Sequence, residues 1–153
     1  PLLTMLLASP IPIQRMALMV QKEVADRMQV GPGTKDYGAL SLAVQYYAKP
    51  EIVAIVPPNC FIPRPNVASA VIRLTCHEKK PVEVKNEKGM FALIRASFNQ
   101  RRKTLANSLS NAQNLSLTRE QVTEALESMQ LSPTIRGEAL TLEQFAALAD
   151  ILL

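Results

Sequence analysis

The 153-residue sequence has little of several residue types, and each shortage excludes a class of protein. It has no Trp, two Cys, one His and five Gly, while 48% of its residues are hydrophobic and 20% are charged. This composition excludes collagen-like, low-complexity and intrinsically disordered chains. Unbroken apolar runs reach only five residues, far below the ~18 needed to span a bilayer. We therefore expect a globular chain, about one domain in size, with no membrane partner.

The cysteines and the single histidine do not form a recognisable metal motif. Cys60 and Cys76 lie sixteen positions apart without Cys-x-x-Cys spacing, and His77 directly follows Cys76. A structural zinc site needs four well-spaced ligands, whereas these residues supply at most three. We therefore predict no metal site. The low cysteine usage indicates a reducing compartment, and we expect the cytoplasm.

Negative charge is missing from one long stretch in the second half of the chain. Residues 88–119 hold six Lys or Arg and no Asp or Glu, although the net charge of the whole chain is only +4. Residues 120–153 reverse this balance, with one Lys or Arg and six Asp or Glu. A local basic excess is typical of a surface that binds a polyanion such as nucleic acid. A solvated helix face is the alternative, but such faces usually intersperse both signs.

The first half of the chain alternates helical and strand patterns. We predict helices over residues 1–8, 22–28 and 36–48, and strands over 16–20, 52–56 and 67–74. The first two strands are continuous apolar runs, a pattern that suits strands covered on both faces. Within the second helix, Lys22 with Asp26 and Glu23 with Arg27 have the i,i+4 spacing that lets opposite charges meet.

A proline-rich segment separates the last two predicted strands. Four prolines, Pro57, Pro58, Pro63 and Pro65, fall within nine positions and predict a stiff, extended loop that is neither strand nor helix. A connection of about ten residues without a helix is too short for a parallel crossover, so these strands should run antiparallel. This half of the sequence therefore predicts the tail of an α/β sheet whose front half is missing.

Phe61 lies between the prolines, where a strand of the sheet should end. Ligands of open α/β sheets collect at the carboxyl ends of strands, so an exposed ring there could stack on a flat substrate such as a base. Alternatively, the ring fills the core under the loop, which is the commoner fate of Phe. The residues themselves leave both interpretations open.

Residues 78–87 are a charged segment that we interpret as a linker, and beyond it every pattern is helical. In a straight helix from residue 90, Arg102 would lie about 20° from Phe91, inside the apolar stripe, so we expect a break near Asn99. Capping boxes at Thr118 and Thr141 each place Gln three residues after Thr and predict two further helices. This half therefore predicts a small all-α bundle.

The segment from Phe98 to Leu109 combines three consecutive cations with amide side chains. Arg and Lys position a phosphate backbone, amides donate and accept hydrogen bonds, and the start of a helix would point further backbone N–H groups outward. We predict an RNA-contacting element. Its residues are Arg95, Asn99, Gln100, Arg101, Arg102 and Lys103.

Four segments also carry a family resemblance. Residues 60–71, Cys-Phe-Ile-Pro-Arg-Pro-Asn-Val-Ala-Ser-Ala-Val, resemble the Phe-x-Pro-x-Pro-x-Val-x-Ser motif of ribosomal RNA adenine dimethyltransferases. Residues 95–105, Arg-Ala-Ser-Phe-Asn-Gln-Arg-Arg-Lys-Thr-Leu, are similar to the signature of the small-subunit branch, and residues 19–27 and 33–41 also look like that branch. The four motifs stand in the right order and cover essentially the whole chain.

The resemblance implies a fold. Residues 1–77 would be the distal part of a Rossmann-like methyltransferase sheet, residues 78–87 a linker, and residues 88–153 a small helical RNA-binding domain. The family's glycine-rich cofactor loop, ribose-binding acid and Asn-Leu-Pro-Tyr motif would all precede Pro1. We therefore expect a fragment that contains no cofactor-binding residues and is inactive alone.

The resemblance also implies an activity. Members use S-adenosylmethionine to place two methyl groups on the exocyclic amine of each of two adjacent adenines in small-subunit ribosomal RNA. The partners would be that RNA and the small ribosomal subunit. Phe61 would stack on the target adenine, with Pro63 and Pro65 shaping its loop.

Two other functions within the superfamily stay open at this point. One is a non-enzymatic relative that binds RNA, assists ribosome assembly or, like mitochondrial transcription factors, serves transcription. The other is the antibiotic-resistance branch that methylates large-subunit RNA, which the signature from Phe98 to Leu105 disfavours. If the front of the sheet is absent, its exposed edge would be a site where chains could associate.

Overall fold

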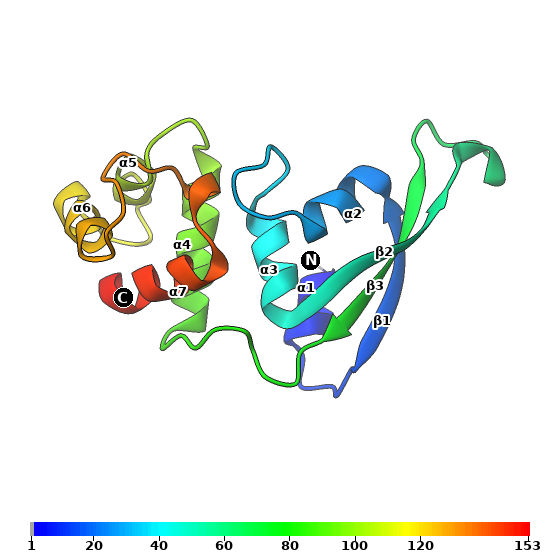
Figure 1. The fold of residues 1–153 in the computed structure, drawn as a ribbon, viewed down its shortest axis with the longest axis horizontal. Helices are drawn as coiled ribbons and strands as arrows, with labels where there is room; N and C mark the ends of the chain where they lie inside the picture. The colour runs from blue at the N-terminus through cyan, green and yellow to red at the C-terminus, as the bar shows by residue number, and fades with distance from the viewer. Residues whose placement is uncertain (1) are drawn as a thin grey trace. The chain divides into compact units, whose positions relative to one another are not determined.

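The computed structural model describes residues 2–153, an α/β fold with a three-stranded antiparallel sheet and seven α-helices in that range (Figure 1). Pro1, where the first predicted helix starts, lies outside the described residues. In chain order the elements are α1 (Leu2–Ala8), β1 (Arg15–Gln21), α2 (Lys22–Gln29), α3 (Ala39–Tyr47), β2 (Ala48–Val56), the 3-10 helix η1 (Pro58–Cys60), β3 (Ser69–Cys76), α4 (Glu87–Asn99), α5 (Leu105–Ser110), α6 (Arg119–Ser128), the 3-10 helix η2 (Gly137–Ala139) and α7 (Leu142–Leu152).

The chain forms two compact units. The sheet unit contains residues 2–31 and 35–81, and the helical unit contains residues 32–34 and 82–153. The division after Pro81 falls inside the charged segment 78–87, and α4 already begins at Glu87. No helix in residues 2–153 combines the length and apolar character needed to cross a membrane.

The sheet has the strand order β1-β3-β2, and β3 is antiparallel to both neighbours. The predicted antiparallel pairing across the proline-rich segment is thus confirmed. Ile72 in the middle strand lies opposite Leu18 of β1 and Ile52 of β2. Its side chain is fully buried in one cluster with Ala25 of α2 and Val44 of α3, against which residues of α1 also pack. This cluster is the core of the sheet unit.

The expectation that the strands are covered on both faces is wrong for the described residues. Exposure alternates along β1, and Met19 is 57% exposed. Along β2, Val53 and Ile55 are also exposed. The physical reason is that α1, α2 and α3 all contribute to the cluster on the Ile72 side of the sheet. An apolar run alone does not show which elements are present to cover it.

Two prolines behave differently from the prediction. The predicted helix over 36–48 is shorter, because β2 begins at Ala48 and includes Pro50. A proline without an N–H is tolerated there because β2 is an edge strand.

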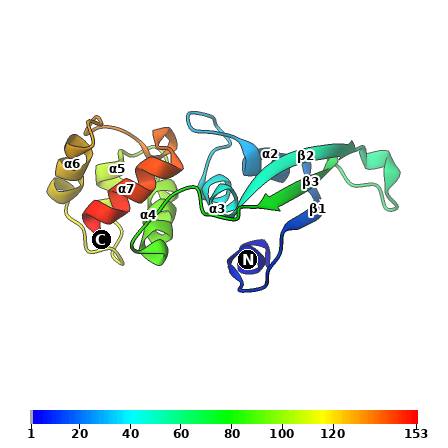
Figure 2. The ribbon, with the colours of Figure 1, turned by 60° about the horizontal axis from the view of Figure 1, so that its bottom comes forward.

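The proline-rich loop also contains the 3-10 turn η1, with Pro58 at its first helical position, where no N–H donor is needed. Figures 1 and 2 show this loop projecting beyond the ends of β2 and β3.

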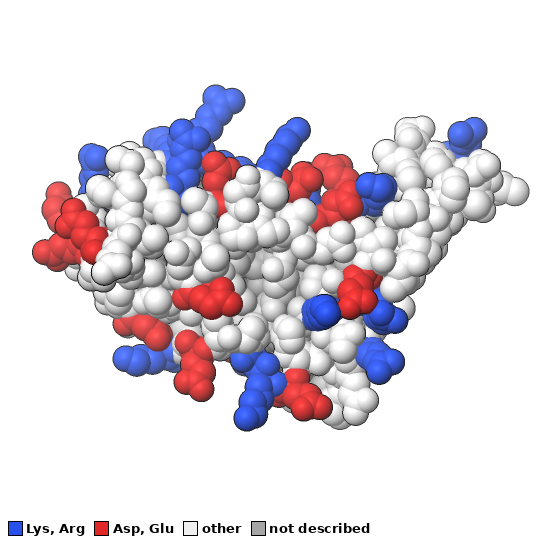
Figure 3. Space-filling model, in the orientation of Figure 1, with Lys and Arg blue, Asp and Glu red and all other residues white. Residues whose placement is uncertain are grey.

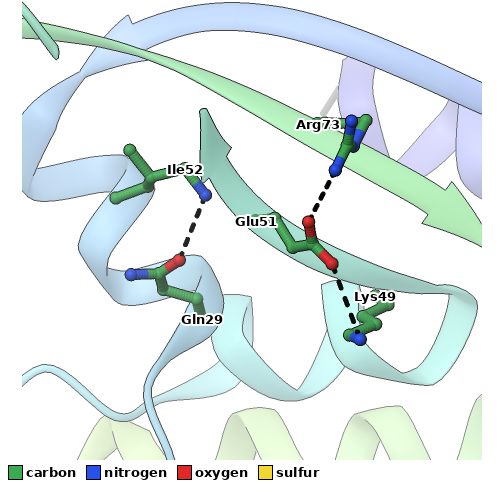
Figure 4. A network of polar contacts seen from close by, with 5 residues as sticks. All are labelled: Gln29, Lys49, Glu51, Ile52 and Arg73. Carbon is green, nitrogen blue, oxygen red and sulfur yellow. Dashed lines mark hydrogen bonds and ion pairs between the residues drawn. The ribbon is translucent and has the colours of Figure 1, made fainter. Parts of the chain in front are cut away.

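Polar side chains organise the outer strand β2 (Figure 4). The Glu51 carboxylate accepts a hydrogen bond from Arg73 Nη2 at 2.7 Å and lies 3.5 Å from Lys49 Nζ. The hydrogen bond from Arg73, its positive charge and that of Lys49 lower the pKa of Glu51 below its usual value. Gln29 Oε1 accepts the backbone N–H of Ile52 at 3.4 Å. A side chain at the end of α2 thus accepts a hydrogen bond from a backbone N–H of the edge strand β2.

The helical unit confirms the local signals of the sequence. Helix α4 ends at Asn99 and α5 begins at Leu105, so the predicted break is present. Both capping boxes form, with reciprocal hydrogen bonds between Thr118 and Gln121 and between Thr141 and Gln144. The buried core side chains of the four α-helices are Met90, Leu93, Ile94, Leu105, Leu109, Val122, Leu126, Leu142, Phe145 and Leu148.

Candidate nucleic-acid interface

The six residues predicted to contact RNA lie together at the end of α4 and in the turn that follows it. Arg95 and Asn99 are exposed and four residues apart, hence on the same side of α4. Gln100 caps the helix, and the exposed residues Arg101 to Lys103 form the turn. Figure 3 shows Lys and Arg side chains gathered at the edge where α4 leads into α5.

Gln100 is the residue that shapes this turn. Its backbone carbonyl accepts the Lys103 N–H at 3.0 Å and the Ser108 hydroxyl at 3.3 Å. Its side-chain oxygen accepts Asn111 Nδ2 at 3.4 Å. The Arg101 guanidinium lies 5.8 Å from the centroid of the Phe98 ring, within cation–π range. Hydrogen bonds through Gln100 therefore hold the backbone of the turn, and Arg101, Arg102 and Lys103 remain exposed.

We predicted that backbone N–H groups at the start of α5 point outward. This prediction is wrong for two residues. The Leu105 N–H donates to the Ile135 carbonyl at 2.8 Å, and the Asn107 N–H donates to Thr104 Oγ1 at 3.3 Å. Both donors are used inside the protein because a distant segment packs beside the turn and Thr104 caps the helix. The cationic side chains, rather than these backbone groups, remain to meet a phosphate.

Sequence reasoning missed two residues of this surface, Arg136 and Glu138. Glu138 Oε2 lies 3.8 Å from Arg101 Nη2, and Glu138 Oε1 lies 4.0 Å from Arg136 Nη1. Arg136 is separated from Lys103 by more than thirty residues and stands in the acidic part of the sequence. One signal could have marked it, because it is the single Lys or Arg of residues 120–153.

The helical unit also has an acidic side. Helix α6 carries Glu120, Glu124 and Glu127, all exposed. Figure 3 shows acidic side chains gathered over α6, apart from the Lys and Arg side chains near the turn between α4 and α5. On the face drawn in Figure 3, the acids of α6 thus lie apart from the cations of the turn. Such segregation favours an oriented approach of a polyanion.

Phe61 lies in the projecting loop of the sheet unit, and its side chain is half-buried. Its N–H donates to the Pro58 carbonyl at 3.3 Å, while its neighbours Cys60 and Ile62 are exposed. Phe61 is not part of the buried core cluster. The structure therefore does not support the interpretation of this ring as a fully buried core residue.

The sheet unit has a pocket of about 330 Å³ beside the N-terminus of α2. Its lining includes Lys22 and Asp26, which pair with each other at 2.9 Å, and Ala68, whose carbonyl accepts the Lys22 N–H at 3.0 Å. The Lys22 and Asp26 side chains are thus already paired with each other. Within residues 2–153, no three or more His, Cys, Asp or Glu side chains gather in a way that could hold a metal ion.

Residues 2–153 do not contain a glycine-rich turn between a strand and a helix. In open α/β sheets such a turn holds the phosphates of a dinucleotide cofactor. Here Gly31 and Gly33 follow helix α2 instead, and β1 leads directly into α2 through Gln21 and Lys22. No chemical step is therefore assigned to S-adenosylmethionine in this chain.

Comparison with known proteins gives concordant matches. Residues 1–152 match the profile of a family described as ribosomal RNA adenine dimethylase. The chain is 67% identical to ribosomal RNA small subunit methyltransferase A of Lachnoclostridium phytofermentans, over 99% of this chain and 52% of that protein. It is 52% identical to the protein of the same name from Halothermothrix orenii, over 99% of this chain and 50% of that protein. The chain thus spans about half the length of these curated relatives.

Two solved structures share the fold. A dimethyladenosine transferase from Plasmodium falciparum matches with a TM-score of 0.81 and 24% identity, over 97% of this chain and 60% of that one. The 23S rRNA methyltransferase ErmE matches with a TM-score of 0.61 and 23% identity, over 95% of this chain and 57% of that one. At these identities the likeness concerns the fold.

Proposed function

Because this chain belongs to the ribosomal RNA adenine dimethylase family, we propose that it is the second half of an enzyme that dimethylates adenines of small-subunit ribosomal RNA. The observation that carries the proposal is the 67% identity to a ribosomal RNA small subunit methyltransferase A over nearly the whole chain. The small-subunit RNA and the small ribosomal subunit are then the partners, and the cytoplasm is the compartment.

We propose that the sheet unit is part of the methyltransferase domain and that the helical unit binds RNA. In this assignment residues 1–77 are the distal part of a Rossmann-like sheet, residues 78–87 the linker and residues 88–153 the RNA-binding domain. Two observations support it. One edge of β1 has no partner strand in residues 2–153, and the face of the sheet that bears Met19 is exposed. Further strands and helices of a larger sheet would occupy both.

Phe61 is proposed to stack on the target adenine after it leaves the RNA helix. Enzymes that modify a base inside a duplex extrude it into a pocket, where aromatic rings sandwich it. The half-buried position of Phe61 in a projecting loop, outside the buried core, supports this role. Pro63 and Pro65 restrict the backbone of the loop. Stacking on a base is worth ~1–3 kcal/mol.

The turn formed by residues 101–103, which we call the basic turn, is proposed to bind the RNA backbone. Arg101, Arg102 and Lys103 would contact phosphates, with Arg136 beside them, while Arg95 and Asn99 extend the surface along α4. Gln100 acts through the turn, because its carbonyl and side-chain oxygens have partners within the protein. Contacts of this kind position RNA without reading its sequence.

S-adenosylmethionine supplies the methyl group in this proposal and binds in the part of the protein that this chain does not span. A purified 153-residue chain should therefore transfer no methyl group by itself. A direct test fuses the chain to the missing half of the Lachnoclostridium phytofermentans relative. We expect the fusion to methylate small-subunit RNA. The intact relative is the positive control. RNA binding by a soluble fusion without any transfer would favour a non-enzymatic relative instead.

RNA binding by the chain itself has an independent signature. If the five cations of this surface, Arg95, Arg101, Arg102, Lys103 and Arg136, each neutralise one phosphate, affinity for a small-subunit RNA stem-loop should fall roughly 100- to 500-fold between 50 and 200 mM salt. The substitution Arg102→Gln should weaken binding, whereas Lys88→Gln should have a smaller effect. Lys88 is near the start of α4, thirteen residues before Arg101, or about 20 Å at 1.5 Å per residue. Affinity independent of salt would contradict RNA binding by this turn.

A further inference from the structure

Residues 135–138 form a segment packed against the basic turn, and the backbone fixes its position. The hydrogen bond from the Leu105 N–H to the Ile135 carbonyl, 2.8 Å long, ties the segment to a residue only two positions after Lys103. The backbone carbonyl of Glu138 in turn accepts the N–H of Gly33, which belongs to the same unit, at 2.9 Å. The segment is thus anchored at both ends.

Gly137 allows this segment to approach α4 closely. A Cβ atom at position 137 would lie 2.9 Å from Ser97 Cβ, a separation that real Cβ atoms essentially never show. Ser97 is buried, and its hydroxyl donates to the Leu93 carbonyl at 2.8 Å, so it has little freedom to move. The close contact therefore holds the two flanking residues, Arg136 and Glu138, beside the end of α4.

The carboxylate of Glu138 lies between two guanidinium groups without forming a tight bond to either. The separations of 3.8 Å to Arg101 and 4.0 Å to Arg136 exceed the ~2.7–2.9 Å of a charge-assisted hydrogen bond. The side chains of Arg101 and Arg136 are 43% and 53% exposed. Both guanidinium groups therefore face solvent while a carboxylate offsets part of their charge.

A phosphate and this carboxylate are chemically similar partners for a guanidinium group. Both are anionic oxygen acceptors that arginine can bind through two N–H groups. Glu138 is an acidic residue whose carboxylate pairs with Arg101 of the basic turn and with Arg136 beside it. An RNA phosphate that approaches Arg101 or Arg136 therefore meets a competing anion already in place.

From this arrangement we propose that Glu138 competes with RNA phosphates for Arg101 and Arg136, so that it lowers the affinity of the surface for RNA. The inference rests on the proposed RNA-binding function and deepens it. In the free chain Glu138 keeps the two arginines near each other. In the complex the arginines turn toward phosphates, and the carboxylate loses its partners. The competition discriminates against RNA that cannot offer phosphates to both arginines.

The test uses the whole 153-residue chain and a small-subunit RNA stem-loop, with affinity measured at several salt concentrations. Glu138→Gln preserves the size of the side chain and removes its charge. It should tighten binding several-fold at 50 mM salt. If one more cation becomes available to a phosphate, the salt dependence also steepens, and the gain should be about threefold larger at 50 mM than at 200 mM.

Two further variants separate local competition from a general charge effect. Glu124→Gln removes the same charge from α6 and should change affinity much less. In an Arg101→Gln background, Glu138→Gln should gain less than in the unmodified chain, because one of the two competed cations is gone. Circular dichroism and thermal unfolding of each variant establish that it is folded.

The outcomes distinguish this proposal from the function on which it rests. If Arg102→Gln weakens binding but Glu138→Gln weakens it too or leaves it unchanged, Glu138 is not a competitor and this inference is wrong. Equal gains from Glu138→Gln and Glu124→Gln would also overturn it. If affinity depends on neither salt nor Arg102, RNA binding by the basic turn is itself wrong.

Discussion

The two units of this chain differ in where their apolar side chains lie. Among the exposed large hydrophobic side chains of residues 2–153, all except Ile151 and Leu153 lie in the sheet unit. The helical unit instead closes a core around fully buried residues such as Leu126 and Phe145. Its distinctive surface is ionic, with cations at the α4–α5 turn and acids over α6. The sheet unit thus presents apolar surface for covering elements, whereas the helical unit presents charge.

The largest expected difference between the units concerns loss of apolar side chains. Phe145→Ala removes a fully buried ring from the helical unit and should cost ~3–5 kcal/mol of stability. Met19→Ala, on the exposed face of the sheet, should change stability by only about 0.5 kcal/mol or less. Chemical denaturation of both variants measures the difference. Equal losses would show that the exposed face of the sheet is covered in solution.

The next effect tests the close packing of residues 135–138. Gly137→Ala places a methyl group against Ser97 and should destabilise the helical unit by ~1–3 kcal/mol. Gly31→Ala is the matched control, because no atom lies within 4 Å of its added Cβ and its φ is not in the left-handed region. Similar melting temperatures for the two variants would contradict the predicted contact.

A smaller effect should follow from the capping boxes. In Thr118→Ala the N–H of Gln121 loses its side-chain acceptor at 3.1 Å, which should cost ~1 kcal/mol. Thr123→Ala serves as the control within the same helix, because the Thr123 hydroxyl donates to the Arg119 carbonyl and caps no free N–H. Denaturant midpoints of the two variants compare the losses. Because Ala has a higher helix propensity than Thr, Thr123→Ala should not destabilise the helix by itself, and an equal loss from it would contradict the assignment of the effect to capping.

The smallest predicted effect concerns pH and belongs to the sheet unit. Arg73 lowers the pKa of Glu51 in the folded chain, so the charged carboxylate contributes stability at pH values above its unfolded pKa. That contribution should disappear as the pH falls through the lowered folded pKa. NMR titration of the Glu51 carboxyl should show the lowered pKa, and Arg73→Gln should move it toward the ordinary value. An unchanged pKa in that variant would contradict the assigned cause.

Local signals were sufficient for much of this fold. The Thr-x-x-Gln boxes predicted the starts of α6 and α7, and the position of Arg102 relative to Phe91 predicted the break after α4. The short proline-rich connection predicted the antiparallel pairing of β2 with β3. Each of these signals depends on neighbours within a few residues or on the length of one connection.

The parts that could not be predicted depend on contacts between distant segments. An apolar run does not reveal that three helices gather on one face, so the exposure of Met19 was missed. The carbonyl that receives the Leu105 N–H belongs to Ile135, thirty residues away, and the same segment brings Glu138 to Arg101. Sequence therefore identified the cations of α4 and of the turn after it, but missed Arg136 and the acid near both Arg136 and Arg101.

The central claim is that the basic turn binds RNA while the Phe61 loop serves methyl transfer. The most direct measurement compares Phe61→Ala with the double variant Arg102→Gln/Lys103→Gln in the fused full-length enzyme, recording RNA affinity and the rate of methyl transfer for bound RNA. Phe61→Ala should lower the transfer rate about 5- to 150-fold, the equivalent of ~1–3 kcal/mol of stacking, with little loss of affinity. The double variant should lose affinity and transfer normally once saturated. Parallel losses of affinity and rate in both variants would contradict the claim.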